Sequence, residues 1–222
     1  MSNSDEYTQK LENVIKQMLT PVKNVPFHLV IETLSETKVL DFDKQNHKDN
    51  NLLNNLVHVA RMAGNNINKQ EIHRRRANEV GNAIEPFVKN ALHKQGYYAD
   101  TPKTIEGNKK STGYPDLCFY DEYSRMIYLE CKTFNDQTKN TTQRSFYLSP
   151  SQNFKITEDA HHLVISYEIY TDRTENSNYV FKTSSWKILS IKDLEVDVKY
   201  EFNSDNKRLY NDKFVLAEEN LK

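Results

Sequence analysis

Apolar residues recur at helical spacing in the first part of the chain. The first helical pattern is "SDEYTQKLENVIKQML", which begins at a candidate cap, Ser4, and stops before a proline. The second is "NNLLNNLVHVARMAG", whose apolar residues fall at intervals of three and four, and Gly64 marks its end. Both patterns predict amphipathic helices.

A third helical pattern follows in "NKQEIHRRRANEVGNAIEPFVKNALHKQGY". Its apolar residues form one stripe, and Gly96 closes it. Because Pro86 removes a backbone donor inside this pattern, we expect a kink or a break into two helices near Glu85.

From Tyr97 onward the pattern becomes strand-like. The strand-like runs are "YYADTP", "PDLCFY", "RMIYLECKTF", "HHLVISYEIY", "NYVFKTSSWKIL" and a weaker "VDVKYEF". Residues 135–158 interrupt them with a segment rich in Ser, Thr, Asn and Gln, and a loop this long in a compact domain is either functional or disordered. Helices followed by strands predict an α+β fold with an N-terminal helical region.

The composition is that of a globular protein with a near-neutral charge and local basic clusters. The 222 residues include 13 tyrosines and 10 phenylalanines, which supply apolar surface for one well-buried core. The 30 lysines and arginines nearly balance 31 acids, which excludes a general polyanion-coating protein. Basic clusters at 69–76, 107–113 and 138–144 suit nucleic-acid contacts on one face, and solvated surface charge is the alternative for each.

Location and redox state follow from what the sequence lacks. It has no apolar run of the roughly 18 residues that a membrane span needs, and its first residues lack the features of a signal peptide. We therefore expect a cytoplasmic protein. In that reducing compartment Cys118 and Cys131 are expected to be free, buried thiols, and a structural zinc site is not expected.

Three charged residues stand inside two of the apolar strand-like runs. Side chains alternate along a strand, so Glu130 and Lys132 share one face. If the two runs pair as a hairpin through "DEYSR", Asp116 lies beside them. Two close carboxylates repel each other unless a cation intervenes, and Mg²⁺ typically takes one or two carboxylates with phosphate and water. With a lysine that holds water, these residues suit attack on a phosphodiester.

Pro115-Asp116, thirteen intervening residues and Glu130-Cys131-Lys132 resemble the motif of PD-(D/E)xK superfamily nucleases, and specifically of type II restriction endonucleases. The resemblance implies a restriction-endonuclease-like core, with a helix and a mixed central β-sheet flanked by helices. It also implies that Asp116, Glu130 and the backbone carbonyl of Cys131 bind Mg²⁺, with Mn²⁺ as a substitute, and that Lys132 orients the attacking water. The alternative for these charges is a salt bridge at a strand edge.

The resembled family often adds an acid from the preceding helix, four residues after a glycine. Gly81 and Glu85 have this spacing, so Glu85 is the preferred fourth catalytic residue. Glu79 is the competing choice, and the alternative for both is a solvated acid on the helix surface.

Several polar and basic residues are candidates for DNA contacts. The segment after Lys132 lacks the helix that usually follows there in the resembled family, and it emerges beside the predicted site. Glutamine suits adenine and arginine suits guanine in base readout, whereas Phe146 and Tyr147 are expected to anchor the loop. The candidates are Lys139, Thr141, Thr142, Gln143 and Arg144 in this loop, Arg74, Arg75 and Arg76 at the start of the glutamate-bearing helix, and Lys109 and Lys110.

The favoured function is a Mg²⁺-dependent type II restriction endonuclease that cleaves both strands of double-stranded DNA at a short specific sequence as a homodimer. A cognate DNA methyltransferase is expected in the same system, without a stable complex. The alternatives are a structure-selective nuclease of DNA repair or junction resolution, and a non-catalytic DNA-binding protein with a nuclease-like fold.

The favoured function also suggests a division of the chain. Residues 1–75 would form a helical subdomain for dimerisation, DNA contacts or both. Residues 76–222 would form the catalytic domain, with 135–158 as its DNA-facing loop. The alternative is one compact domain overall.

Overall fold

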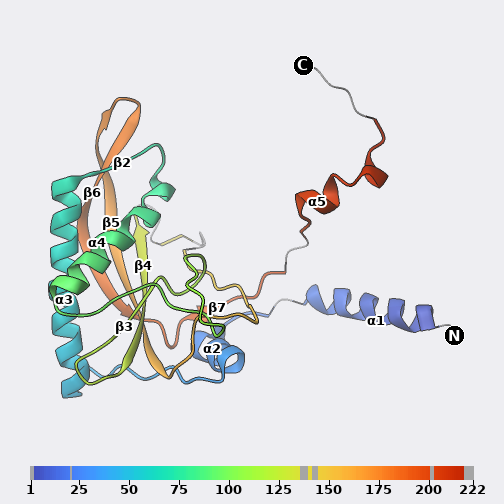
Figure 1. The fold of residues 1–222 in the computed structure, drawn as a ribbon, viewed down its shortest axis with the longest axis horizontal. Coiled ribbons are helices and arrows are strands. Elements are labelled where there is room, and N and C mark those ends of the chain that lie inside the picture. Colours follow the sequence, from blue (N-terminus) through green and yellow to red (C-terminus); the bar gives the residue numbers. More distant parts are fainter. Residues whose placement is uncertain (1–2, 21, 136–139, 142–144, 201–202, 218–222) are drawn as a thin grey trace. The chain divides into compact units, whose positions relative to one another are not determined.

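The computed structural model describes residues 3–20, 22–135, 140–141, 145–200 and 203–217 (Figure 1). The chain divides into two compact units. One is Pro26–Leu194, and the other combines Met1–Val25 with Glu195–Lys222. The larger unit holds the acids and the lysine of the predicted site.

A mixed sheet forms the centre of the larger unit. Its described part contains five strands in the order β2-β6-β5-β4-β3. Strands β4 and β5 run parallel, and the other neighbouring pairs are antiparallel. The strands are β2 (Ile72–Arg74), β3 (Leu117–Tyr120), β4 (Met126–Phe134), β5 (Ala160–Glu175) and β6 (Asn178–Ser190).

Two long helices cover one face of this sheet. Helix α3 (His47–Gln70) packs against β6, helix α4 (Gly81–Lys94) packs against β4, and the two helices contact each other (Figure 1). Their apolar stripes form a buried cluster with alternate strand residues such as Leu129 and Ile165. The first core therefore lies between the helix pair and the sheet.

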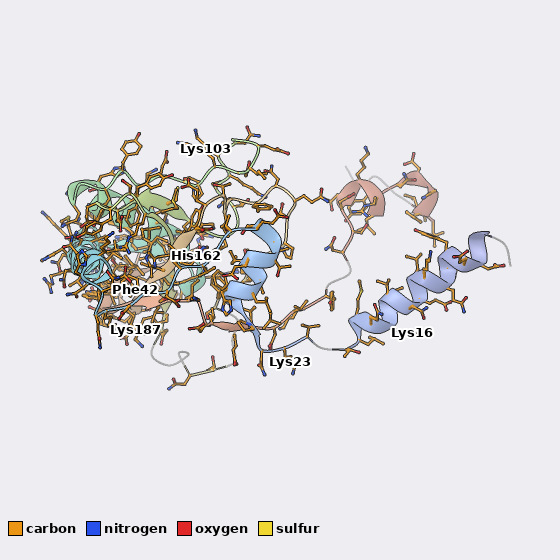
Figure 2. All side chains as sticks on the ribbon, turned by 90° about the horizontal axis from the view of Figure 1, so that it is seen from below. Lys16, Lys23, Phe42, Lys103, His162 and Lys187 are labelled. Atoms are coloured by element: carbon orange, nitrogen blue, oxygen red, sulfur yellow. The ribbon has the colours of Figure 1, made fainter. Side chains whose placement is uncertain are left out.

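Helix α2 (Phe27–Ser35) belongs to a second buried cluster. This cluster contains Tyr128 and Val164, the strand neighbours of residues in the first cluster, and therefore lies on the opposite face of the sheet. His162, labelled in Figure 2, contacts Phe27 and shares a 2.7 Å hydrogen bond with the Tyr114 hydroxyl. The prediction of an α+β fold, with a mixed central sheet and flanking helices, is confirmed.

Two of the weaker strand-like runs form less structure than their patterns predict. "YYADTP" gives only an isolated bridge between Asp100 and Cys118, and the Asp100 carboxylate accepts the N–H of Thr101. In the described part of "VDVKYEF" the only strand is β7 (Glu195–Val196), which pairs with the equally short β1 (Val25–Pro26). Proline has no N–H with which to extend that pairing.

Gly64 does not end a helix, contrary to the prediction, because α3 continues to Gln70. A Cβ at Gly64 would lie 3.4 Å from a ring carbon of Tyr167 and 3.6 Å from the Thr183 methyl group. Gly64 is thus buried against the sheet inside a continuing helix, where a methyl group would lie at the edge of ordinary van der Waals contact.

The third helical pattern is divided in the structure: its start, residues 68–70, belongs to α3, and the residues between α3 and α4 are not α-helical. After α3, residues 72–74 form β2 along β6, and the 3₁₀ helix η1 (Ala77–Glu79) precedes α4. The division begins at Glu71, whose φ of 59° ends the helix. Ion pairs with Arg173 (2.7 Å) and Lys182 (3.3 Å) hold its carboxylate and lower its pKa to about 2. Contacts with the distant β5–β6 hairpin therefore override the local helical pattern.

The predicted break at Pro86 does not occur, since α4 runs unbroken from Gly81 to Lys94. Only one backbone hydrogen bond is lost at a proline in this position. The buried stripe of Ile84, Val88 and Leu92 holds the helix on both sides of it.

The smaller unit contains α1 (Asn3–Met18), α5 (Asn206–Leu209) and the 3₁₀ helix η2 (Asp212–Phe214). In the part of the chain that the structure describes, no helix combines the length and the apolar character that a membrane span requires. Both cysteines, Cys118 and Cys131, are free thiols as predicted; Cys131 is buried, whereas Cys118 is half-buried, contrary to the prediction.

Candidate active site

The β3–β4 hairpin brings Asp116 to Glu130, as the strand alternation predicts. Leu117 of β3 pairs with Leu129 of β4 in the antiparallel register. Asp116, which precedes Leu117, therefore faces Glu130, which follows Leu129. The turn between the strands is closed by Asp121, whose Oδ1 accepts the backbone N–H groups of Tyr123 and Arg125, each at 2.9 Å.

Asp116, Glu130 and Lys132 form one connected cluster at the open end of the hairpin. The backbone N–H of Asp116 donates to Glu130 Oε2 at 3.2 Å. The backbone N–H of Cys131 donates to Asp116 Oδ2 at 2.8 Å. Lys132 Nζ lies 2.6 Å from Glu130 Oε1, and Glu130 is only 4% exposed. On each side of the hairpin, a backbone N–H group therefore orients the carboxylate of the opposite side.

The electrostatics of the two acids differ from those of a satisfied ion pair. Burial and the nearby charge of Asp116 raise the pKa of Glu130 to about 7, although Lys132 acts in the opposite direction. Burial also raises the pKa of Asp116, against the Cys131 N–H and Lys132. The cluster therefore holds negative charge that its own lysine does not offset.

Glu85 and Glu79 occupy different surroundings. Glu85 lies on α4, where burial and the charge of Asp116 raise its pKa, while Lys89 and Lys155 lower it. Glu79 lies in η1 and is exposed. Of the two candidate helix acids, the structure thus brings Glu85 into electrostatic contact with Asp116.

Lys155 is a residue of this site that the sequence did not indicate. It lies in the connection from β4 to β5 and is 4% exposed. Its Nζ donates to the carbonyl groups of Gly113 at 2.6 Å and Pro115 at 2.8 Å. The only local signal is its position between Phe154 and Ile156, which marks an apolar anchor at the end of the polar segment.

The carboxylate oxygens of this cluster fit a hard divalent cation whose other ligands are phosphate and water. Among the described residues no group of three or more His, Cys, Asp or Glu side chains is arranged to hold a metal ion. Asp116 and Glu130 provide two adjacent carboxylates with raised pKa, and one or two carboxylates are what Mg²⁺ usually takes from a protein. The excess negative charge is the feature that a cation would relieve.

The candidate DNA contacts are placed in part. Arg74 is in β2, where its guanidinium donates to the His73 carbonyl at 2.8 Å, and not at the start of a helix as predicted. Lys109 forms an ion pair with Asp100. Arg75, Arg76, Lys110 and Thr141 are exposed, while Lys139, Thr142, Gln143 and Arg144 lie outside the described residues. Their roles in DNA binding stay predictions.

Phe146 anchors the end of the polar segment against the site, as predicted. Its ring lies 5.7 Å from the ring of Phe27 and 5.4 Å from that of Tyr114, and Lys132 Nζ lies 5.9 Å from its centroid. Tyr147 is 57% exposed and does not belong to this aromatic cluster. In the described part of the connection from β4 to β5 there is no helix.

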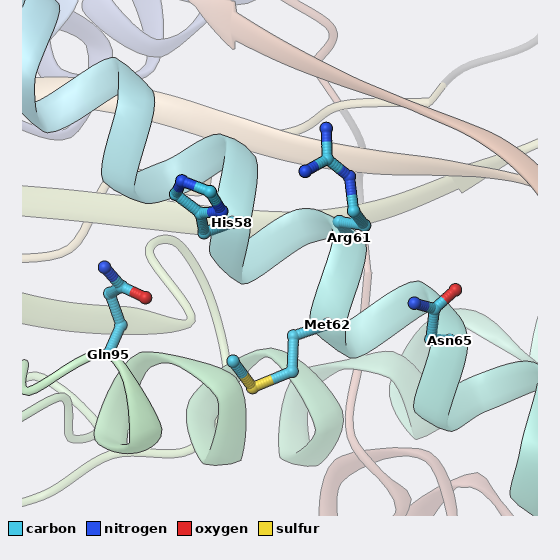
Figure 3. Close-up of a pocket in the computed structure, with 5 residues that line it drawn as sticks. All are labelled: His58, Arg61, Met62, Asn65 and Gln95. Carbon is cyan, nitrogen blue, oxygen red and sulfur yellow. The ribbon is translucent and has the colours of Figure 1, made fainter.

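A separate pocket lies on the outer surface of α3, beside the end of α4 (Figure 3). It has a volume of about 470 Å³. The residues that line it are His58, Arg61, Met62, Asn65 and Gln95. The acid cluster does not contribute to it, and its wall offers no acid–base pair for hydrolysis.

Comparison with known proteins agrees with a nuclease site. The model of the type II restriction enzyme MjaV family matches residues 10–213. Type II restriction enzyme MjaV of Methanocaldococcus jannaschii is 35% identical over 231 residues, which cover 97% of this chain and 98% of that protein. Both matches span the hairpin, the helices around it and nearly all the rest of the chain. The chain therefore belongs to the type II restriction enzyme MjaV family, a family of restriction endonucleases.

Proposed function

We propose that the protein is a Mg²⁺-dependent endonuclease that cuts both strands of a short specific DNA sequence, with Asp116, Glu130 and Lys132 at its catalytic centre. Membership of a type II restriction enzyme family supports DNA cleavage. The observation that carries the assignment of the centre is the contact network of the three residues, in which two adjacent carboxylates with raised pKa are accompanied by one lysine, paired with Glu130. The resemblance of the motif and its hairpin to those of the PD-(D/E)xK superfamily also supports this assignment.

The residues of the cluster have separate tasks in this proposal. Asp116, Glu130 and the Cys131 carbonyl hold Mg²⁺, which when bound offsets the charge of the scissile phosphate and polarises a water molecule. Lys132 holds the attacking water in position. The backbone N–H groups of Asp116 and Cys131 keep the carboxylates in place before DNA binds, so little rearrangement is needed for reaction.

Sequence readout is proposed for the segment 135–158, which follows directly from the strand that carries Lys132. A homodimer would read a symmetric site with two copies of this segment, and each copy would cut one strand. Glu85 would support the centre from α4. A DNA methyltransferase that modifies the same sequence would act separately, and both would act on DNA in the cytoplasm.

Digestion of plasmids of known sequence with Mg²⁺, followed by sequencing of the ends, tests this function. Discrete fragments with a common end sequence are expected. Lys132→Ala should abolish cleavage and leave DNA binding intact. Lys187→Ala is a matched control, because Lys187 Nζ also lies over an aromatic ring, 4.9 Å from that of Phe134. This variant should cleave like the wild type.

Other outcomes would overturn the proposal. Cutting only at branched DNA would indicate a structure-selective nuclease instead. Absence of cutting by the wild type with Mg²⁺ or Mn²⁺, across a varied set of sequences that it nevertheless binds, would indicate a non-catalytic DNA-binding protein.

A further inference from the structure

Lys155 is a buried lysine with no part in the proposed chemistry, yet it touches the segment that leads into the acid pair. Its ammonium group bonds to carbonyl groups on both sides of Tyr114. The next residue, Ile156, belongs to the buried cluster around α2, so the chain here is fixed in the core. Lys155 thus connects the end of the polar segment to the start of β3.

Burial of a lysine at this position costs desolvation free energy unless nearby groups interact with its ammonium group. Burial lowers the pKa of Lys155, while the charges of Asp116, Glu130 and Glu85 act to raise it. Apolar residues of similar volume would fill a buried site at a lower desolvation cost. Simple filling of the core therefore does not account for this side chain.

The two hydrogen bonds act directly on the backbone that carries Asp116. Gly113 and Pro115 precede β3 and take no part in its ladder, and Pro115 has no N–H of its own. Lys155 supplies the fixed donor that this stretch lacks. The N–H of the next residue, Asp116, then donates to Glu130.

We propose that Lys155 is a positioning residue for DNA cleavage: its grip on two carbonyl groups fixes Asp116 against Glu130. Because Lys155 lies at the end of the polar segment, it also links the position of that segment to the acid pair. This inference rests on the proposed function. It differs from a purely electrostatic role, in which Lys155 would compete with Mg²⁺ for the carboxylates.

Lys155→Met tests the inference, since methionine keeps the length and loses the donors. Single-turnover cleavage should fall about 100-fold, the scale expected for a misplaced reacting group. The Mg²⁺ concentration for half-maximal rate should rise about 10-fold, as for loss of a residue that supports a metal ligand. Affinity for the cleavable DNA, measured with Ca²⁺ in place of Mg²⁺, should stay unchanged.

A second measurement needs no metal and no cleavage. The Cys131 amide, which donates to Asp116, should exchange its hydrogen faster in metal-free Lys155→Met than in the wild type. The Thr183 amide, which donates to Asn68 at 2.7 Å, should exchange at the same rate in both. Lys155→Arg keeps the donors and should recover part of the cleavage rate. Should Lys155→Met fail to fold, Lys155→Leu, which also lacks the donors, replaces it in the same comparison.

Lys182→Met is the matched control, because the ammonium group of Lys182 also has two partners, the carboxylates of Glu71 and Asp172, away from the acid pair. It should cleave like the wild type. A lower Mg²⁺ requirement in Lys155→Met would overturn the inference in favour of the electrostatic role, and wild-type cleavage with unchanged Cys131 exchange would overturn it outright. Failure of the proposed function looks different, because the wild type itself would then cut no DNA.

Discussion

The β3–β4 hairpin has buried carboxylates at both of its ends, and the two ends differ in how these charges are balanced. At the turn, Arg125 Nε donates to Asp121 Oδ2 at 2.7 Å, and the same guanidinium forms an ion pair with Asp49 of α3. At the open end, Asp116 and Glu130 face each other with Lys132 on only one of them. The presence of a cation therefore does not distinguish the two ends.

The direction of the pKa shifts does distinguish them. Burial raises the pKa of Asp49, but hydrogen bonds from Arg125 and the Asp43 N–H outweigh it and leave the pKa below its ordinary value. At the open end burial prevails, and the pKa of Glu130 rises to about 7. The turn thus satisfies its charges within the protein, whereas burial at the open end raises the pKa of two adjacent carboxylates, a perturbation that is common at functional sites.

Asp116→Asn should show the difference between the two ends most clearly, because it should lower cleavage strongly without lowering stability. Cleavage should fall on the order of 1,000-fold, because a carboxylate of the proposed centre is lost. Without divalent ions the melting temperature should stay the same or rise, because the repulsion with Glu130 is relieved. Thermal unfolding in EDTA and single-turnover cleavage measure the two effects. A large loss of stability would instead support the alternative of a structural salt bridge.

Asp49→Asn should show the opposite pattern at the turn. Arg125 would lose one charged partner in a mostly buried setting, which costs about 2–3 kcal/mol of unfolding free energy. Urea unfolding checks this value. Cleavage by the folded protein, assayed well below its melting temperature, should match the wild type. Reduced cleavage by fully folded Asp49→Asn would show that the turn also serves the reaction.

The hairpin and its three charged residues could be predicted because the information is local. Alternation places Glu130 and Lys132 on one face, and the short turn fixes the register with Asp116. The predicted helix end at Gly64 and the helical pattern predicted through residues 72–74 are wrong, because Gly64 lies against Tyr167 and Glu71 pairs with Arg173, which are both distant in sequence.

Lys155 shows the limit of sequence patterns in this fold. It lies in an irregular segment without periodicity, so no spacing rule indicates which way its side chain points. Its partners are backbone carbonyl groups, which any residue provides. The fold class follows from the order of helices and strands, whereas a contact of this kind depends on tertiary structure alone.

The two ends should also contribute to stability in different pH ranges. Folding raises the pKa of Glu130 from 4.5 to about 7, so the folded state binds this proton more tightly. The resulting stability is present below pH 4.5 and is lost as the pH rises through 7. Asp49, whose pKa is lowered, contributes stability that is lost only as the pH falls.

Glu130→Gln should therefore remove part of this pH dependence. Relative to the variant, the metal-free wild type should lose about 2–3 kcal/mol between pH 5 and pH 8, since one unit of pKa corresponds to roughly 1.4 kcal/mol. Urea unfolding at several pH values measures the difference. Mg²⁺ should stabilise the wild type more at pH 8 than at pH 5. Parallel pH profiles of the two proteins would contradict the assignment.

The smallest effect is expected for the acid on α4. Glu85 feels the charge of Asp116, so Glu85→Gln should lower the cleavage rate about 10-fold, the scale of a residue that supports a metal site. Glu79→Gln is the matched control, because Glu79 is exposed in η1, and it should cleave like the wild type. A lower cleavage rate in Glu79→Gln alone would identify Glu79, and not Glu85, as the acid that supports the site. Wild-type rates in both variants would confine the functional charge of this region to the hairpin, because α4 would then contribute only packing.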